Sequence, residues 1–192
     1  LGVTTRISLT IQSTTYGTIT QNFAFTPTLV NLLWEADTSV PPLYRSKALY
    51  SPGSQVKVIA LPQVVVQGTT VSSNNLSFRW SVNGDPMTAQ SGKGRNTITI
   101  QGDQLHKGEQ VSVDVYFGDV RVGQGSVFIP ATNPFVLFYN RDPLRRTLYD
   151  QAFPSTVSLL GEEMTVQAQP YYFSNQSIEN SSLTYEWTLN NE

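Results

Sequence analysis

Hydrophobic and polar residues alternate along several short stretches of this chain. In residues 76–84 and again in residues 183–191, a large apolar residue occupies every second position: Leu76, Phe78, Trp80 and Val82, then Leu183, Tyr185, Trp187 and Leu189. Strict alternation is the pattern of a β-strand with one buried face. Asn-Gly or Asn-Asn follows each stretch, which is typical of a tight turn. We therefore expect two matching strands, each with a buried tryptophan.

Other segments recur in the same order and indicate an internal repeat. Each recurring segment also alternates or ends at a turn, so each is expected to be a strand or half of a hairpin. The corresponding segments are 6–11 with 110–115, 21–27 with 124–130, 32–37 with 137–142, and 56–62 with 164–170.

This repetition predicts an all-β chain of tandem immunoglobulin-like sandwiches with no significant helix, because no long stretch has a 3.6-residue period. We expect residues 1–27 to be the last hairpin of a preceding unit, residues 28–131 to be a complete sandwich, and residues 132–192 to be an incomplete unit that lacks its last strands. The predicted core residues are Trp80, Trp187, Phe78, Tyr185, Val58 and Val166.

Composition excludes several classes of function. Only 14% of residues are charged and the net charge is −2, so no basic field is present to bind nucleic acid. The chain has no cysteine, which excludes disulfides and thiolate metal sites. No apolar run reaches the roughly 18 residues that a membrane helix needs, so we expect no membrane insertion within this segment.

Catalytic motifs are missing as well. His106 is the single histidine, and it lies in a polar turn without a nucleophile motif. The Gly92-Lys93 pair lacks the flanking residues of a phosphate-binding loop. Glu35, which could pair with Asp37, is replaced by Asn140 in the second copy. We therefore expect no enzymatic activity and no cofactor.

Asp37 and Asp142 occupy corresponding positions at the ends of corresponding strands. Aspartate commonly caps turns, and this is our preferred interpretation of both residues. A calcium site near the domain junctions is the alternative, since carboxylates are hard oxygen ligands.

The pattern Leu-x-Tyr/Phe-x-Trp-x-x-Asn, together with Gly-Glu-Gln-Val-Ser-Val-Asp-Val at residues 108–115, resembles the polycystic-kidney-disease-like and bacterial immunoglobulin-like repeats of cell-surface proteins. This resemblance implies a non-enzymatic structural module outside the cell, such as a stalk, an adhesin segment or a filament subunit. Its partners would be neighbouring repeats or identical subunits arranged head to tail. The alternative is a carbohydrate-binding module of an exported protein, with Tyr172 stacking on a sugar.

The two ends of the chain correspond to complementary parts of one repeat. A hairpin with Ile7, Leu9, Ile11, Phe23 and Phe25 would cover the apolar face of residues 183–189. One explanation is a longer tandem array, in which further chain supplies the cover. The other is head-to-tail strand exchange, in which the hairpin of one subunit completes the next. The longer array is our preferred explanation, because an interrupted repeat is the simpler event.

Overall fold

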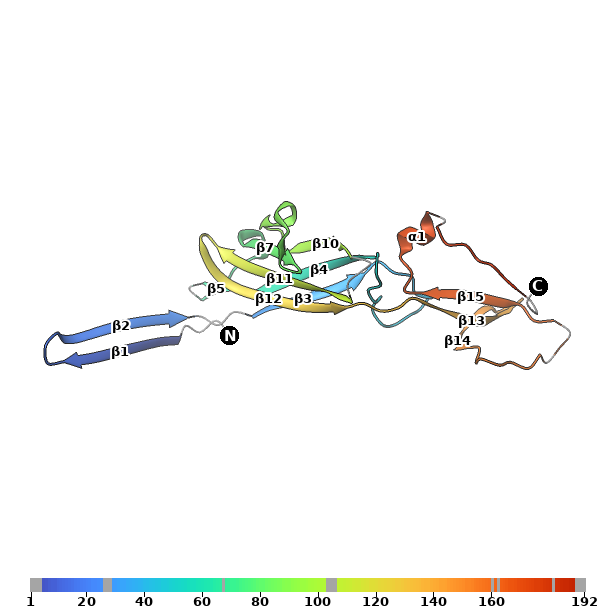
Figure 1. Ribbon diagram of the computed structural model, residues 1–192, viewed down its shortest axis with the longest axis horizontal. Helices are drawn as coiled ribbons and strands as arrows, with labels where there is room; N and C mark the ends of the chain where they lie inside the picture. Colours follow the sequence, from blue (N-terminus) through green and yellow to red (C-terminus); the bar gives the residue numbers. More distant parts are fainter. Residues whose placement is uncertain are drawn as a thin grey trace. The chain divides into compact units, whose positions relative to one another are not determined.

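The structure is a computed structural model that describes residues 5–25, 29–66, 68–102, 107–159, 161, 163–180 and 182–188, without the side chains of residues 5, 6 and 23–25. Strands dominate these residues, and one α-helix of five residues is present among them. The prediction of an all-β fold is confirmed (Figure 1). The immunoglobulin-like arrangement of its sheets stays a prediction.

The strands are β1 (Thr5–Ser13), β2 (Gly17–Phe25), β3 (Leu29–Ala36), β4 (Gln55–Gln63), β5 (Val65–Val66), β6 (Thr69–Thr70), β7 (Ser77–Val82), β8 (Asp85–Pro86), β9 (Gly92–Lys93), β10 (Thr97–Gln101), β11 (Gly108–Phe117), β12 (Val120–Pro130), β13 (Phe135–Asp142), β14 (Arg146–Ala152) and β15 (Val166–Tyr171). The helices are the 3₁₀ turns Ser73–Asn75 and Thr88–Gln90 and the α-helix α1 (Asn175–Glu179).

The first two strands form an antiparallel hairpin in continuous register, from Thr5 opposite Phe25 to Ser13 opposite Gly17. At the turn, the Ser13 hydroxyl accepts a hydrogen bond from the backbone N–H of Tyr16 (3.2 Å), and Gly17 has a φ of +73°. Among the described strands, β1 and β2 pair only with each other.

Two larger sheets follow along the chain. One has the strand order β10-β4-β3, and the other has the order β12-β11-β7-β8, with β9 also paired to β7. Their strands bury alternate residues, as the period of two requires. The fully buried side chains include Val56, Val58, Phe78, Ile98, Val111, Val113 and Val115.

Trp80 of β7 is also buried, with only 2% of its surface exposed. Its indole N–H donates to the carbonyl of Arg95 (2.8 Å), and its backbone N–H donates to the Ser91 hydroxyl (2.9 Å). A buried indole needs such a partner, because an unpaired buried donor is costly. Trp80 therefore holds the glycine-containing loop before β10 against β7.

A third sheet has the order β14-β13-β15. Strand β13 pairs antiparallel with β15, from Phe135 opposite Tyr171 to Asn140 opposite Val166. The chain divides into two compact units. One unit comprises residues 1–33, 58–98 and 110–128. The other comprises residues 34–57, 99–109 and 129–192, and so includes the third sheet. The loop between β3 and β4 thus belongs to the same unit as this third sheet.

Trp80 and Trp187 occupy corresponding positions in the two matching segments, so their alanine variants form a paired test of this core. Trp80→Ala should lower the free energy of unfolding by about 3–5 kcal/mol, because it leaves a large buried cavity. Trp187→Ala should cost less than about 0.5 kcal/mol in dilute solution, since such surface changes rarely cost more and Trp187 is 60% exposed. Urea denaturation followed by circular dichroism measures both, and equal losses would contradict this description of the core.

Candidate functional site

The structure separates the predicted core residues into two groups. Phe78, Val58 and Trp80 are buried. Val166 on β15 is half-buried. Tyr185 and Trp187 differ from the expectation, since they are 55% and 60% exposed.

The exposure of Tyr185 and Trp187 has a direct cause. The described residues 182–188 belong to no strand, so no strand of the described residues pairs with this segment. On the inner side, the Trp187 ring contacts Phe138 of β13, with ring centroids 5.9 Å apart. An open cavity of about 480 Å³ separates Tyr185 and Trp187 from β15. The segment therefore lies beside the third sheet with its aromatic side chains only partly packed.

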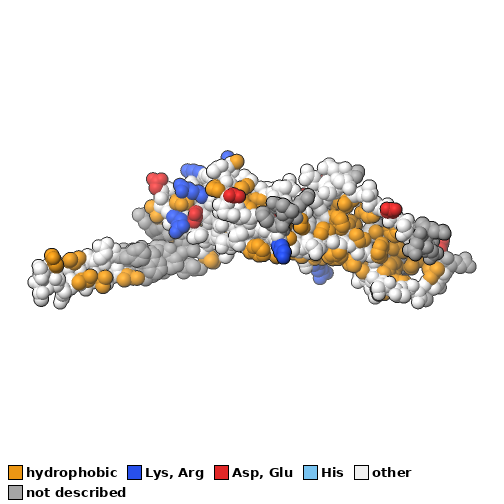
Figure 2. All heavy atoms as spheres, in the orientation of Figure 1, with side chains coloured by type: hydrophobic (Ala, Val, Ile, Leu, Met, Phe, Trp, Pro, Cys, Tyr) orange, Lys and Arg blue, Asp and Glu red, His pale blue; other side chains and the backbone are white. Residues whose placement is uncertain are grey.

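The β1–β2 hairpin presents a second exposed apolar surface, visible in Figure 2 as a row of hydrophobic side chains along these strands. Its members share one face of the hairpin, because the register places Ile11 opposite Ile19 and residues two apart point the same way. They are Ile7, Leu9, Ile11 and Ile19, exposed by 53%, 58%, 55% and 55%. The side chains of the other two predicted residues, Phe23 and Phe25, lie outside the described atoms, although the backbone register sets Phe23 opposite Ile7.

The opposite face of the hairpin is mostly polar. It carries serine, threonine, glutamine and asparagine, and the Thr10 and Thr20 hydroxyls are 3.2 Å apart across the strands. Arg6 is the single charged residue in positions 1–34. Proteins commonly protect exposed strand edges with lysine, proline or other charges. Strands β1 and β2 carry little of this protection, so their edges are open to pairing.

Tyrosines form the most extensive buried cluster of the third sheet. Tyr139 of β13, Tyr171 at the end of β15 and the following Tyr172 are 3–7% exposed. Tyr44, from the loop between β3 and β4, packs edge-on against Tyr171 and Tyr172, with centroid distances of 6.4 and 6.5 Å. Phe135 stacks on Tyr171 at 4.9 Å with an interplanar angle of 7°. Such ring pairs add stability beyond the area that they bury.

The hydroxyls of this cluster are paired with one another. Tyr44 and Tyr172 share a hydrogen bond of 2.6 Å, and Tyr139 bonds to Tyr171. Burial, followed by the hydrogen bond to Tyr44, raises the pKa of Tyr172 to about 12. Burial and the hydrogen bond to Tyr139 raise the pKa of Tyr171 as well. Tyr171 and Tyr172 therefore keep their hydroxyl protons at neutral pH.

Backbone hydrogen bonds also join the loop between β3 and β4 to the residues that follow β15. The Ser39 N–H donates to the carbonyl of Phe173 (2.7 Å), and the Tyr172 N–H donates to the carbonyl of Ser39 (2.8 Å). The Asn175 side chain donates to the Asp37 carboxylate (2.7 Å). Tyr172 holds a left-handed φ of 60°, which is uncommon for a bulky residue. We call these residues, with the tyrosine cluster, the tyrosine joint.

The sequence did not predict the tyrosine joint. Tyr44 and Tyr172 are 128 residues apart, and no periodic pattern brings them together. The adjacent tyrosines at 171 and 172 were the one available signal, and they suggested sugar stacking or strand-end packing. Tyr172 is 7% exposed, so its ring has no open face for a sugar.

The two predicted aspartates have different environments. The Asp142 carboxylate accepts the backbone N–H groups of Leu144 and Arg145, each at 2.8 Å, in the turn between β13 and β14. These two bonds lower the pKa of Asp142. Asp37 instead bonds to Asn175 in the tyrosine joint. No hydrogen bond within the described residues connects the two carboxylates.

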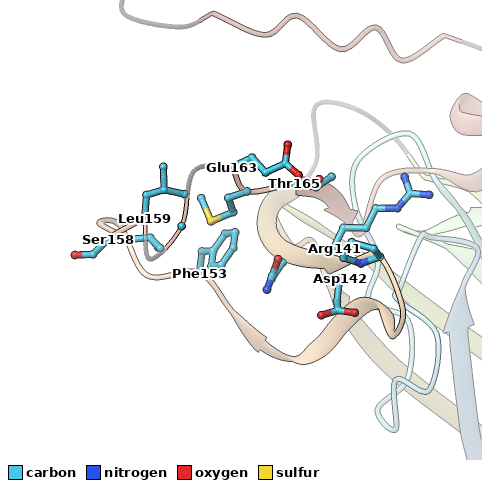
Figure 3. Close-up of a pocket in the computed structure, with 12 residues that line it drawn as sticks. Arg141, Asp142, Phe153, Ser158, Leu159, Glu163 and Thr165 are labelled. Carbon is cyan, nitrogen blue, oxygen red and sulfur yellow. The ribbon is translucent and has the colours of Figure 1, made fainter.

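A cavity of about 350 Å³ lies beside Asp142 (Figure 3). Its polar side includes Arg141 and Glu163, and its apolar side includes Phe153 and Leu159. No group of three metal-ligating side chains occurs in the described ranges, and the labelled charges in Figure 3 do not converge on one point.

Other sequence candidates are placed as follows. His106 lies outside the described residues. Gly92 and Lys93 form β9 and pair with β7, so the loop considered for phosphate packs beside the Trp80 strand. Lys93 is exposed there.

No protein-family model, curated protein or solved structure matches this chain. None of the helices in the described part of the chain is long and apolar enough to span a bilayer.

The raised pKa of Tyr172 predicts a loss of stability in alkali. The unfolded chain loses the Tyr172 proton near pH 10, whereas the folded chain keeps it to about pH 12, so stability falls as the pH rises through this range. Tyr172→Phe cannot ionise, so its unfolding free energy should fall less steeply between these pH values. Urea denaturation at a series of pH values measures this, and an unchanged slope would contradict the assignment.

Variants of Asp142 test the capping role against calcium binding. Asp142→Ala removes the acceptor of both backbone bonds, whereas Asp142→Asn keeps one side-chain oxygen. The alanine variant should therefore have the lower thermal midpoint. Addition of a chelator should leave the wild-type midpoint unchanged, because turn capping needs no ion. A midpoint that falls with chelator and recovers with calcium would support the calcium alternative.

Proposed function

We propose that this chain is a non-enzymatic structural and interaction module built from tandem immunoglobulin-like repeats, as part of a stalk, adhesin or filament at the cell surface. The tyrosine joint carries this proposal. It ties the loop between β3 and β4, in the predicted complete repeat, to β13 and β15 in the predicted next one. A protein whose role is to extend needs such fixed connections between successive repeats.

The pairing of corresponding segments supports the repeat. Strand β3 lies beside β4, and β13 lies beside β15. In the sequence, residues 32–37 correspond to 137–142 and residues 56–62 correspond to 164–170. The same two segments are therefore neighbours in both copies, as expected if each copy forms the same unit.

The chemistry of the joint also favours a mechanical role over a binding role. Its aromatic rings pack against one another, and the hydroxyls of Tyr44, Tyr139, Tyr171 and Tyr172 are used in pairs within the cluster. Sugar-binding aromatic residues need an exposed ring face, and catalytic groups need access to a substrate. The joint has the buried, mutually satisfied character of a structural contact.

Hydrogen exchange tests the joint with a matched pair of tyrosine variants. Tyr172→Ala should remove the protection of the Ser39 and Tyr172 amides, whose backbone bonds depend on this packing. Tyr16→Ala alters a tyrosine that is 80% exposed, and should leave these amides protected. The Val113 amide on β11 should stay protected in both variants.

A glycan-binding screen completes this test. Wild-type protein should bind no glycan through Tyr172, because the ring of Tyr172 is almost completely buried. Binding that Tyr172→Ala abolishes would overturn the proposal in favour of a carbohydrate-binding module. Unchanged exchange at Ser39 in the Tyr172→Ala variant would show that the cluster does not hold the two segments together.

A further inference from the structure

The tyrosine joint brings two phenol groups from distant parts of the chain into direct contact. Tyr44 and Tyr172 are 128 residues apart in sequence, and their hydroxyl oxygens are 2.6 Å apart. Their rings pack edge to face, with centroids 6.5 Å apart and an interplanar angle of 73°. Two phenol rings in contact are the reactants of dityrosine formation, in which an oxidant joins two tyrosines through a carbon–carbon bond.

We propose that Tyr44 and Tyr172 are a site of oxidative crosslinking, in which a bond forms between the two ring carbons that lie next to the hydroxyl-bearing carbons. Each tyrosine loses one electron and one proton in total. The oxidant is a peroxide, and hydrogen peroxide takes up the two electrons and two protons to become two water molecules. The proposal rests on the structural role of the tyrosine joint and deepens it, because the new bond makes the contact covalent.

The geometry of the pair already resembles that of the product. In the crosslinked product the two hydroxyls flank the new bond and lie beside each other, and the ring planes are twisted because a flat arrangement would crowd the hydroxyls. In the joint the hydroxyls are in contact and the planes are steeply inclined. The rings therefore have to move closer together, but they keep their relative orientation. Holding two reactants in this way favours their reaction over encounters between separate molecules.

The hydrogen bond gives the buried tyrosine a route to oxidation. Tyr44 is half-buried, so a small oxidant reaches it more readily than Tyr172, which is 7% exposed. Loss of an electron to the oxidant and of the hydroxyl proton to water converts Tyr44 to a phenoxyl radical. The Tyr172 hydroxyl then passes its hydrogen atom along the hydrogen bond to Tyr44, which moves the radical to Tyr172.

A second oxidation completes the reaction. Tyr44 again loses one electron and one proton, so two radicals now lie side by side and combine through their ring carbons. The hydrogen atom on each of these carbons moves to the neighbouring oxygen, which restores both aromatic rings and both hydroxyls. The net change is the loss of two hydrogen atoms and the gain of one carbon–carbon bond.

Two further features favour this reaction. The raised pKa of Tyr172 keeps its hydroxyl protonated at neutral pH, so the hydrogen atom is available for transfer. The chain has no cysteine, so no thiol of its own reduces the radical before the rings combine. The same composition leaves the chain without disulfides, which are the usual covalent staples of extracellular proteins.

The neighbouring Tyr171 provides an internal control. Its ring packs against Tyr44 in almost the same way as the ring of Tyr172, with a centroid distance of 6.4 Å and an interplanar angle of 79°. However, the Tyr171 hydroxyl bonds to Tyr139. The two neighbours of Tyr44 thus match in ring packing and differ in hydroxyl contact. If the hydroxyl contact directs the reaction, Tyr44 couples to Tyr172 and not to Tyr171.

Photo-oxidation tests the proposal. Light, ruthenium tris(bipyridine) and persulfate together form a small one-electron oxidant, and each persulfate takes up two electrons to become two sulfate ions. A background chain with Tyr16→Phe and Tyr185→Phe removes two tyrosines that are 80% and 55% exposed and would couple between chains. This chain should yield a monomer that is lighter by two hydrogen atoms. Peptide mapping should join the segments that contain Tyr44 and Tyr172.

Phenylalanine variants in the same background identify the reacting pair, since phenylalanine keeps the ring and removes the hydroxyl. Tyr171→Phe should still give the crosslinked monomer, whereas Tyr44→Phe and Tyr172→Phe should not. Equal crosslinking in Tyr171→Phe and Tyr172→Phe would overturn the proposal. A link between Tyr139 and Tyr171 in place of the expected one would overturn it as well.

The wild-type chain shows that the oxidant is effective, because its exposed Tyr16 should couple between chains at high protein concentration. If this coupling occurs while the background chain forms no crosslinked monomer, the proposal is wrong. Hydrogen exchange at Ser39 in the unoxidised chain reports the joint itself. A protected Ser39 amide without crosslinking would therefore contradict the oxidation site and leave the structural role of the joint standing.

The stability of the crosslinked monomer completes the test. A bond between residues 128 apart restricts the unfolded chain, so the thermal midpoint should rise. The rise expected for a crosslink that closes so long a loop is roughly 10 °C. A midpoint that stays unchanged or falls would show that the bond does not form in the native joint, and would contradict the proposal.

Discussion

The strands of this chain that alternate apolar and polar residues each have an apolar face, and such a face is stable in water only when another element covers it. Val56, Phe78, Trp80 and Val113 meet this requirement within the described residues, where they are almost completely buried. Leu9 and Trp187 do not meet it. The difference between these two groups is a difference in cover, since both follow the same alternating sequence pattern.

The tyrosine joint satisfies a different requirement, which is that buried polar groups must be paired. Tyr44 and Tyr172 each contribute a hydroxyl that would be costly to bury alone, and they pair at 2.6 Å. The left-handed backbone at Tyr172 places its N–H against Ser39. Packing and hydrogen bonding thus act on the same few residues, and both favour one arrangement of the loop and the sheet.

Sequence reasoning found the strands because alternation is a local signal. It correctly located the β1–β2 hairpin, and Trp80 and Phe78 are buried as their pattern suggests. It missed the tyrosine joint because Tyr44 and Tyr172 meet only in the folded chain. It also placed Trp187 in a core, because a pattern states which face is apolar and not what covers that face. Helix α1, with five residues, is too short for a periodic signal.

The tyrosine joint has a consequence for the ionic conditions in which it can work. The contacts among Tyr44, Tyr139, Tyr171 and Tyr172 are ring packing and hydrogen bonds between hydroxyls. Dissolved salt weakens contacts between charges by screening them, but has little effect on contacts of this kind. The stability of these ring and hydroxyl contacts should therefore depend little on the salt concentration.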